Sequence, residues 1–457
     1  MKRPVLTHLK TQHILKNNHL KSTKLVTTPF QLRLLQIAIG GMAIISVIWL
    51  GYEFWRLLFQ VGDMGAIDLR NRHNELQTWI EGKNVYREHG TAMYPPASYV
   101  LLYPLMGWLS FGAARWFWAL TTIVALVILV RQSLSFIVLN QKHKTWQFFV
   151  AITFLSMYSI GATIGNGQLP IHIISILLIS IYILQNASNL RTDVLSGILL
   201  SFAFVKPTLS APFIWIFFFK NTRVRPFILL GVIYSACILF SAYQMQTNPI
   251  NLHQDWLKRS IEGAAFGNDQ ISENLTSGEK DLLADKSYVI TYLNDWMEAL
   301  GLHGLSLENA ILGFFILGVW VYFYRNVDIW LLLGVSAIFA RFWTYHMWYD
   351  DLLLLFPLIG LFRKISNQAK QAITPSILLF LLILFSIAPG GLYFFNPPIN
   401  TIYVLLQKIL WLSILIYFIV ESHVQRRDVN YPKNSEVRHK SDAIIVRQQP
   451  KLRTRAF

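Results

Sequence analysis

The sequence predicts an all-α polytopic membrane protein, and three observations support that fold class. Of its 457 residues, 54% are hydrophobic and only 14% are charged, which is far from the usage of an average soluble domain. The mean hydropathy is +0.42, and several apolar runs reach about 18 residues, the length that indicates a transmembrane helix. The basic residues, which give a net charge of +16, crowd into the two ends and a few short loops. This distribution indicates membrane orientation and argues against nucleic-acid binding.

The two ends of the chain are basic. Residues 1–32 contain six Lys or Arg and no acidic residue, and residues 422–457 contain nine Lys or Arg. Because positive segments stay on the cytoplasmic side, both ends are expected to be cytoplasmic tails around a membrane module over residues 33–421. The polar N-terminal segment is not expected to be a cleavable signal peptide. Cys237 is the only cysteine, so an intramolecular disulfide is excluded.

Twelve transmembrane spans are expected. The first span sends its far end outward, so residues 60–112 form a first outer loop. Within it, residues 97–111 are apolar but short. A half-embedded helix there keeps the next basic loop inside, whereas a full crossing would place that loop outside. The expected spans cover residues 34–59, 115–134, 147–164, 168–186, 193–205, 207–220, 226–245, 307–325, 327–342, 352–362, 373–393 and 400–421.

Two features interrupt this pattern. Lys206-Pro207 breaks an apolar run, and because proline removes a backbone donor and clashes with the preceding turn, two short helices are expected to meet there on the outer side. A long outer loop covers residues 246–305, with short amphipathic helices expected around Trp256 and Tyr288. That loop is longer than a connection needs, and it fits a substrate-gating lid and a plain cap equally well.

On this topology the unusual polar residues lie on one side of the membrane. Ionisable groups at the ends of apolar spans are unfavourable unless they pair or line a cavity. Lys206 lies inside an apolar run, and Asp350 and Asp351 lead directly into four leucines. We interpret these as site residues, with solvation of loop ends as the plain alternative. The outer-face set is Asp63, Asp68, Arg70, Arg72, His73, Glu75, Tyr94, Asn166, Gln168, Lys206, Arg341, His346, Asp350 and Asp351.

Four motifs follow one another along this face. In the first, Asp68 precedes Gly82 by fourteen residues, Tyr86 closes a G-x-x-x-Y turn, and Tyr94-Pro95-Pro96 follows. The others are G-N-G-Q at residues 165–168, V-K-P at 205–207 and Y-H-x-x-Y-D-x-L-L at 345–353. In this order the motifs resemble those of glycosyltransferase family 87, integral-membrane enzymes of the GT-C superfamily. The resemblance extends from about residue 60 to residue 365.

The resemblance implies a GT-C fold of about 12 transmembrane helices, with short membrane-surface helices in the first outer loop. It implies a hexosyl- or pentosyltransferase, similar to mannosyl- and arabinofuranosyltransferases, that takes its sugar from a polyprenyl-phosphate donor. Transfer to a lipid or glycan acceptor would occur on the extracytoplasmic face of the inner membrane. The acceptor hydroxyl needs a general base, for which Asp68 is the first choice and Asp63 the second. The leaving lipid phosphate needs cations or donors, for which Lys206, Arg341 and His346 are candidates.

The expected substrate contacts come from aromatic and charged side chains. Trp343, Tyr345 and Tyr349 offer aromatic faces to a glycan, although an interfacial aromatic belt would place the same residues there. Arg70 and Arg72 either bind an anionic substrate group or pair with the base and weaken it. The expected substrate-binding residues are Arg70, Arg72, Tyr94, Gln168, Trp343, Tyr345, Tyr349 and Asp350.

The segment that carries the expected base should be helical. Residues 68–82 are expected to form one amphipathic helix, with Leu69, Leu76, Trp79 and Ile80 lying on the membrane.

No metal and no other cofactor is expected. Asp350 and Asp351 are adjacent acidic residues of the kind that hold divalent cations, but adjacent positions on a helix point in different directions. The expected partners are membrane lipid, the polyprenyl-phosphate sugar donor and a glycan or glycolipid acceptor, with no nucleic acid and no protein.

Two other classes of function remain open. A lipid-linked glycan transporter or flippase would also be polytopic, but it would place polar residues along the spans and often shows an internal repeat. A non-catalytic membrane scaffold would need no carboxylate, lysine and histidine on one face. The clustering of these residues favours the enzyme.

Overall fold

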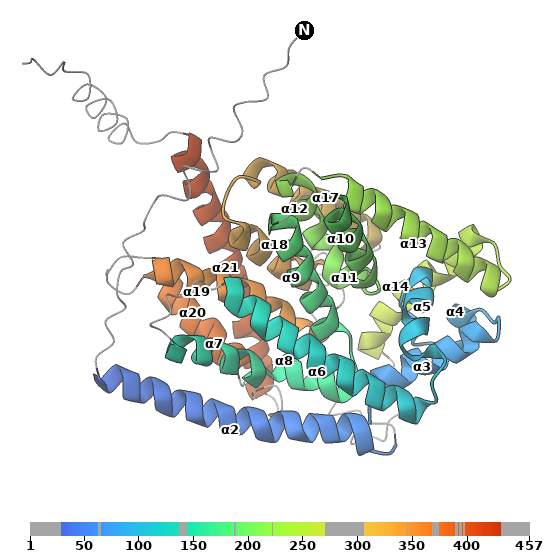
Figure 1. Ribbon diagram of the computed structural model, residues 1–457, viewed down its shortest axis with the longest axis horizontal. Helices are drawn as coiled ribbons and strands as arrows, with labels where there is room; N and C mark the ends of the chain where they lie inside the picture. The colour runs from blue at the N-terminus through green and yellow to red at the C-terminus, as the bar shows by residue number, and fades with distance from the viewer. Residues whose placement is uncertain are drawn as a thin grey trace, which may run out of the picture.

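The computed structural model describes residues 29–62, 65–136, 144–186, 189–221, 223–269, 306–344, 346–367, 374–388, 392, 395 and 398–430. Every regular element in these ranges is helical, which confirms the all-α fold class. Figure 1 shows α2 along one edge of the molecule and the helices of the first loop gathered at one end. In chain order the helices are α2 Pro29–Phe59, α3 Ile67–Ile80, α4 Val85–Glu88, α5 Pro96–Leu102, the π-helix η1 Tyr103–Gly107, α6 Phe111–Phe136, α7 Lys144–Ser156, α8 Tyr158–Asn166, α9 Pro170–Asn186, α10 Leu190–Ala203, α11 Pro207–Ser210, the 3-10 helix η3 Ala211–Phe213, α12 Ile214–Asn221, α13 Arg225–Gln244, α14 Pro249–Asp269, α17 Ser306–Tyr324, α18 Ile329–Trp343, the 3-10 helix η5 Trp348–Leu354, α19 Leu355–Asn367, α20 Pro375–Ile387 and α21 Ile399–Asn430.

Several helices are long and apolar enough to cross a membrane. In the part of the chain that the structure describes, four pass by length and composition: Arg33–Phe59, Phe111–Ser135, Arg225–Gln244 and Ile402–Arg427. The helices Phe148–Ser156 and Tyr158–Asn166, bent by 50° at their junction, make a fifth if they cross as one unit. Shorter apolar helices of 10–17 residues are Pro170–Asn186, Glu308–Tyr324, Ile329–Trp343 and Pro375–Ile387. These helices indicate a membrane-embedded protein.

The expected tails lie largely outside the described residues. At the C-terminal end, α21 continues to Asn430, so residues 422–430, the start of the expected tail, are helical. The amphipathic helix expected around Trp256 is confirmed as part of α14, whereas the one around Tyr288 lies outside the described residues.

The break at Lys206-Pro207 is confirmed. α10 ends at Ala203, and α11 begins at Pro207, with Lys206 at its N-cap in a non-helical conformation (φ −125°, ψ 82°). Proline is favourable at the first helical position, where its missing N–H has no partner to lose. The break therefore lifts Lys206 out of the helical register and lets its side chain reach another segment.

α2 packs closely on α8 through two glycines. A Cβ atom at Gly161 would overlap the Trp49 indole, and one at Gly165 would overlap the Glu53 carboxylate. The paired residues recur every four positions on both helices, the spacing at which small residues let membrane helices approach each other. α2 also packs against α6 and α7, but most of its residues are not buried, and Figure 1 shows it at the edge of the molecule. This contact fixes α8, which leads directly into Gln168.

Gly165→Ala is expected to destabilise the protein by about 1–3 kcal/mol, because the added methyl group overpacks a buried contact. Gly231 in α13 is the matched control, since nothing lies within 4 Å of a Cβ atom there. Gly231→Ala should stabilise its helix by about 0.5–1 kcal/mol. Thermal unfolding in detergent micelles measures both variants, and equal melting temperatures would contradict the close contact of α2 with α8.

The first loop, residues 60–112, is built from short helices. The helix expected over residues 68–82 is confirmed as α3, and Gly82 follows it with φ +77°, a left-handed conformation that glycine adopts without strain. The apolar stretch 97–111 contains α5 and η1, seven and five residues long. Twelve helical residues extend about 18 Å, which is shorter than the roughly 30 Å of a bilayer core.

The expected contact of α3 with the membrane is wrong for most of its apolar face. Leu69 and Leu76 are fully buried inside the protein, and Trp79 is 4% exposed. The Trp79 indole N–H donates to Ser241 Oγ of α13 over 3.1 Å. Of the four apolar residues only Ile80 is exposed. Because α3 packs against α5, α8 and α13, protein contacts set its position.

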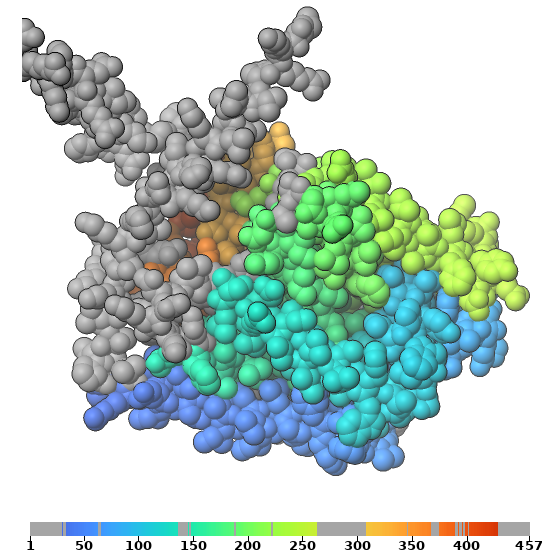
Figure 2. Space-filling model, in the orientation of Figure 1, coloured from blue at the N-terminus to red at the C-terminus, as the bar shows by residue number. Residues whose placement is uncertain are grey.

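α13 and α14 close over the first loop. Figure 2 shows the blue residues of α3, α4 and α5 in one lobe with the yellow-green residues of α13 and α14. On α14, Asp255 accepts hydrogen bonds from the Asn84 amide over 2.7 Å and from Arg87 Nε over 3.0 Å. The N-terminal part of the long loop, residues 246–305, therefore caps the first loop.

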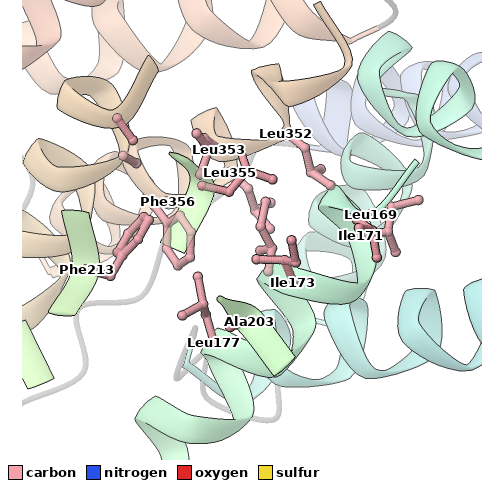
Figure 3. Close-up of a cluster of buried hydrophobic side chains, with 14 of the residues drawn as sticks. Leu169, Ile171, Ile173, Leu177, Ala203, Phe213, Leu352, Leu353, Leu355 and Phe356 are labelled. Carbon is pink, nitrogen blue, oxygen red and sulfur yellow. The ribbon is translucent and has the colours of Figure 1, made fainter. Parts of the chain in front are cut away.

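An apolar core lies next to the polar residues of the second, third and fourth motifs. Figure 3 shows Leu169 and Ile173 packed toward Leu352 and Phe356, with Ala203 and Phe213 beside them. Leu169 directly follows Gln168, and Leu352 directly follows Asp351. The polar side chains therefore come from chain segments whose neighbouring residues are anchored in one shared core.

Candidate active site

Tyr94-Pro95-Pro96 is held by the turn that follows α3. Tyr86 is buried, and its hydroxyl donates to the Tyr94 carbonyl oxygen over 2.8 Å. The Trp256 indole of α14 donates to the Met93 carbonyl oxygen over 3.0 Å. The G-x-x-x-Y motif thus has a physical explanation, because its glycine ends α3 and its tyrosine fixes the backbone at Tyr94.

Asp68 lies in the first turn of α3, where the first and second motifs meet. The Gln168 side chain lies next to the Asp68 carboxylate and favours its charged form. The Tyr94 hydroxyl donates to Gln168 Oε1 over 3.4 Å. Gln168 follows Gly167, whose φ of +69° ends α8 and turns the chain toward α3. The residues expected from the first and second motifs therefore share one site.

The environment of Asp68 favours proton acceptance. Burial raises the pKa of the Asp68 carboxyl above its ordinary value, and the negative charge of Asp350 adds to that effect. Gln168 and the charges of Arg72 and Lys206 oppose it without cancelling it. A carboxylate with a raised pKa is a stronger base near neutral pH.

Lys206 and Asp350 form a largely buried ion pair whose two charges act on Asp68. Lys206 Nζ lies 2.7 Å from Asp350 Oδ1 and 2.9 Å from Oδ2, and it lies 5.0 Å from the centre of the Tyr349 ring. His346 Nδ1 is 2.9 Å from Asp350 Oδ2. Burial would raise the pKa of Asp350, but Lys206 and His346 outweigh it and lower that pKa to about 2. Burial also lowers the pKa of His346, against the effect of Asp350, so the imidazole favours its neutral form.

Arg341 lies behind this pair and has no exposed surface. Its guanidinium is paired with Asp351 through Nε and donates to the His346 carbonyl oxygen over 3.2 Å. The Tyr158 hydroxyl of α8 also donates to Asp351. The expectation that Arg341 contacts the leaving phosphate directly is therefore not supported by its position. Arg341 orients the segment that carries His346.

The two arginines of α3 bind other parts of the first loop. Arg70 donates to the carbonyl oxygens of Gly62 over 2.6 Å and Gly65 over 3.2 Å. Arg72 pairs with Glu75, with Arg72 Nη1 2.7 Å from Glu75 Oε2. Neither arginine forms an ion pair with Asp68 among the described residues, although the charge of Arg72 still lowers the pKa of Asp68. Their direct binding of an anionic substrate group is likewise not supported, since protein groups occupy both guanidinium groups.

The expected aromatic contacts separate into two groups. Tyr349 lies in the site beside Lys206, whereas the Trp343 indole N–H donates to the Ala310 carbonyl oxygen over 2.6 Å and its ring stacks on Phe314. Trp343 therefore packs α18 on α17, away from the site. Tyr345 and the second-choice base Asp63 lie outside the described residues.

Backbone contacts join the motifs to one another. The Ser98 hydroxyl of α5 donates to the Val205 carbonyl oxygen over 2.8 Å, which connects the Tyr-Pro-Pro segment to Lys206. Ser98 and Tyr158 were missed by the sequence analysis, because a hydroxyl inside an apolar run has no distinguishing signal. Glu75 belongs to the polar outer-face set, but its pairing with Arg72 was not predicted. The i,i+3 spacing of the two residues is the signal that could have predicted this ion pair.

A family model covers most of these motifs. The model of glycosyltransferase family 87 matches residues 92–362, which is more than half of the chain and includes the last three motifs. The chain belongs to glycosyltransferase family 87. Comparisons with the curated proteins and with the solved structures gave no significant match.

Membership of family 87, together with the apolar helices, makes the protein a membrane glycosyltransferase. Gln168, Lys206 and Asp350 lie inside the matched residues, whereas α3 precedes them. The structure, rather than the family match, places Asp68 beside Gln168 and within electrostatic range of Lys206 and Asp350.

The acidic pair of the fourth motif is divided between two sets of partners. Asp350 binds Lys206 and His346, while Asp351 binds Arg341 and Tyr158. Within the described ranges, no group of three or more His, Cys, Asp or Glu side chains is arranged to hold a metal ion. Each carboxylate is instead neutralised by a basic side chain.

Proposed function

We propose that this family 87 enzyme transfers a hexosyl or pentosyl group from a polyprenyl-phosphate donor to a lipid or glycan acceptor. The reaction would occur on the extracytoplasmic face of the inner membrane, in a GT-C fold with twelve spans and both termini in the cytoplasm. The observation that carries the proposal is the position of Asp68. A carboxylate with a raised pKa, free of ion pairs among the described residues, lies within electrostatic range of the largely buried Lys206–Asp350 pair.

The proposed reaction assigns a task to each of these groups. The acceptor hydroxyl oxygen forms a bond to the anomeric carbon as the bond from that carbon to the phosphate oxygen breaks. Asp68 takes the hydroxyl proton, and polyprenyl phosphate leaves with the electron pair of the broken bond. Lys206, whose side chain is 12% exposed, supplies positive charge toward the phosphate. His346 and Arg341 hold Asp350 and its segment in position.

The glycan contacts follow from the same arrangement. Tyr349 lies beside Lys206 and offers an aromatic surface, and the Tyr94 hydroxyl reaches Gln168. Asp350 is 1% exposed, so we assign it to positioning Lys206 and not to direct sugar binding.

A panel of labelled polyprenyl-phosphate donors tests the proposal. Purified protein in detergent is incubated with polyprenyl-phosphate mannose, arabinose, glucose or galactose and with a total lipid extract as the source of acceptor. We expect label to move from one of these donors to the acceptor, with release of polyprenyl phosphate. Transfer from nucleotide sugars alone would contradict the proposal. Movement of unchanged glycolipid across reconstituted vesicles, without transfer, would favour a transporter.

Transfer is expected to be independent of divalent cations. Lys206 neutralises Asp350, and Arg341 neutralises Asp351. Neither carboxylate is therefore available as an anionic metal ligand. Activity in excess EDTA should match activity in a magnesium-supplemented control. Loss of transfer in EDTA that added magnesium or manganese restores would show this expectation to be wrong.

A further inference from the structure

Arg72 has two carboxylates within reach on its own helix. Asp68 precedes it by four residues and Glu75 follows it by three, and both spacings place side chains on the same face of a helix. The structure pairs Arg72 with Glu75, at 2.7 Å between Nη1 and Oε2. Glu75 has no exposed side-chain surface and Arg72 has 11%. The cation one helical turn after the proposed base is therefore bound elsewhere.

Glu75 is held by three donors. Besides Arg72, the Thr91 hydroxyl donates to Glu75 Oε1 over 2.9 Å and the Tyr99 hydroxyl donates to Oε2 over 3.2 Å. A buried carboxylate is stable when charged groups and hydrogen bonds satisfy it together. Thr91 and Tyr99 flank the Tyr-Pro-Pro motif, so Glu75 joins α3 to the segment that carries Tyr94.

The Arg72 guanidinium has further contacts besides Glu75. Its Nη2 donates to the Thr91 carbonyl oxygen over 2.5 Å, and its guanidinium lies 4.5 Å from the centre of the Tyr94 ring. A guanidinium on an aromatic face is attracted to the ring electrons, and its planar shape suits that contact. Arg72 therefore supports the ring whose hydroxyl reaches Gln168.

We propose that Glu75 and Arg72 form a positioning pair, in which Glu75 holds the Arg72 guanidinium against the Tyr94 ring and keeps it from forming an ion pair with Asp68. The effect of this pair on catalysis rests on the proposed function. The contacts that Glu75 and Arg72 make do not depend on it. The pair keeps a nearby cation at a fixed place while the base stays available to the acceptor hydroxyl.

Several other groups face these side chains, and they remain in place when the pair is altered. The groups that act on Asp68 are Gln168, Arg72, Lys206 and Asp350. The groups that act on Arg72 are Glu75, Tyr94, Tyr99 and Asp68. Because Lys206 is bound by Asp350, Arg72 is the cation that the loss of one carboxylate would release toward Asp68.

Infrared titration of the Asp68 carboxyl tests the pair without any need for sugar transfer. The Asp68 band is identified in purified full-length protein as the carboxyl band that Asp68→Asn removes. Glu75→Gln should lower the midpoint of this band by roughly one pH unit, because the released Arg72 pairs with Asp68 and favours its charged form. Arg72→Met should move the midpoint in the opposite direction, because it removes a cation.

The double variant Arg72→Met, Glu75→Gln is the decisive comparison. It removes both charges, so no buried charge is left unpaired and the protein should fold even where Arg72→Met does not. The downward shift seen in Glu75→Gln must disappear in the double variant, because its cause is Arg72. Glu81→Gln is the matched control, since Glu81 lies just after α3, is exposed and pairs with Lys83. An unchanged midpoint in folded Glu75→Gln, or the same shift in the double variant, would overturn the proposal.

Kinetics then separates this inference from the proposed function. Glu75→Gln should lower kcat by about 10-fold and move the acid limb of its pH profile downward together with the infrared midpoint, because a carboxylate with a lower pKa is a weaker base. Full transfer by Asp68→Asn would reject Asp68 as the base while leaving the infrared result as the test of the pair. Loss of transfer in Asp68→Asn with no shift in Glu75→Gln would reject the pair alone.

Discussion

Asp68→Asn is expected to lower kcat for sugar transfer by about 10²–10⁴-fold, the range that a general base supplies. Asparagine has the shape of aspartate and retains a hydrogen-bonding oxygen for Gln168, but it cannot accept the proton of the acceptor hydroxyl. The donor should therefore bind with little change in KM. Asp68→Ala should lose activity to a similar degree. Initial rates with the donor identified from the panel measure both variants.

The pH profile of the wild-type enzyme provides a second measure of Asp68. The base must be ionised to act, so activity falls as the pH drops through its pKa. Because burial raises that pKa, the acid limb of kcat/KM should lie above the value of about 4 that is typical of an aspartate. Glu81→Gln is the control for both experiments, since its side chain is exposed and paired with Lys83. Wild-type rates in Asp68→Asn, or loss of sugar transfer only in Asp63→Asn, would show that a group other than Asp68 is the general base.

The sequence predicts the fold class, and it identifies several of the side chains that the structure brings together, because both depend on local signals. Apolar runs predict the helices, and a proline beside Lys206 predicts the break that frees that lysine. Charged residues inside apolar surroundings identify Asp350 and Lys206, since such residues must find partners. The structure brings these two together across a sequence separation of 144 residues, which no local pattern could specify.

The errors in the prediction have a common physical cause. Hydrophobicity alone does not distinguish lipid from protein as the partner of an apolar face, so Leu69 and Leu76 were expected on the membrane although α5, α8 and α13 cover α3. Similarly, charge alone does not distinguish a substrate contact from an internal ion pair. Arg341 and Arg72 were expected at the substrate, but their guanidinium groups are bound by Asp351 and Glu75.

Lys206→Met is expected to reduce both stability and transfer. Both oxygens of Asp350 lie within 2.9 Å of Lys206 Nζ, and Asp350 is 1% exposed, so the variant leaves a buried carboxylate with His346 as its remaining basic partner. Breaking a buried ion pair in this way destabilises a protein by about 3–5 kcal/mol. Transfer should fall by about 10²-fold or more, because a cation placed for the leaving phosphate is also lost. Thermal unfolding and initial rates in the same detergent measure the two effects.

Acid unfolding gives this ion pair a distinct signature. The folded-state pKa of Asp350 is about 2, below the value of about 4 expected in the unfolded chain. A lowered pKa means that the stabilisation is fully present above about pH 4 and is lost as the pH falls toward 2. Lys206→Met should raise the pKa of Asp350, so the variant should lose less stability than the wild type as the pH falls toward 2. Its stability deficit relative to wild type should therefore shrink as the pH is lowered over that window.

The double variant Lys206→Met, Asp350→Asn separates stability from catalysis. Removing both charges leaves no unpaired ion, so the melting temperature should return toward that of the wild type. Transfer should stay low, because restoring the fold does not restore a cation beside the phosphate. Lys83→Met, which removes an exposed lysine, should leave both quantities unchanged. Recovery of transfer in the double variant would mean that Lys206 serves only to neutralise Asp350, and the leaving phosphate would then need a different cation.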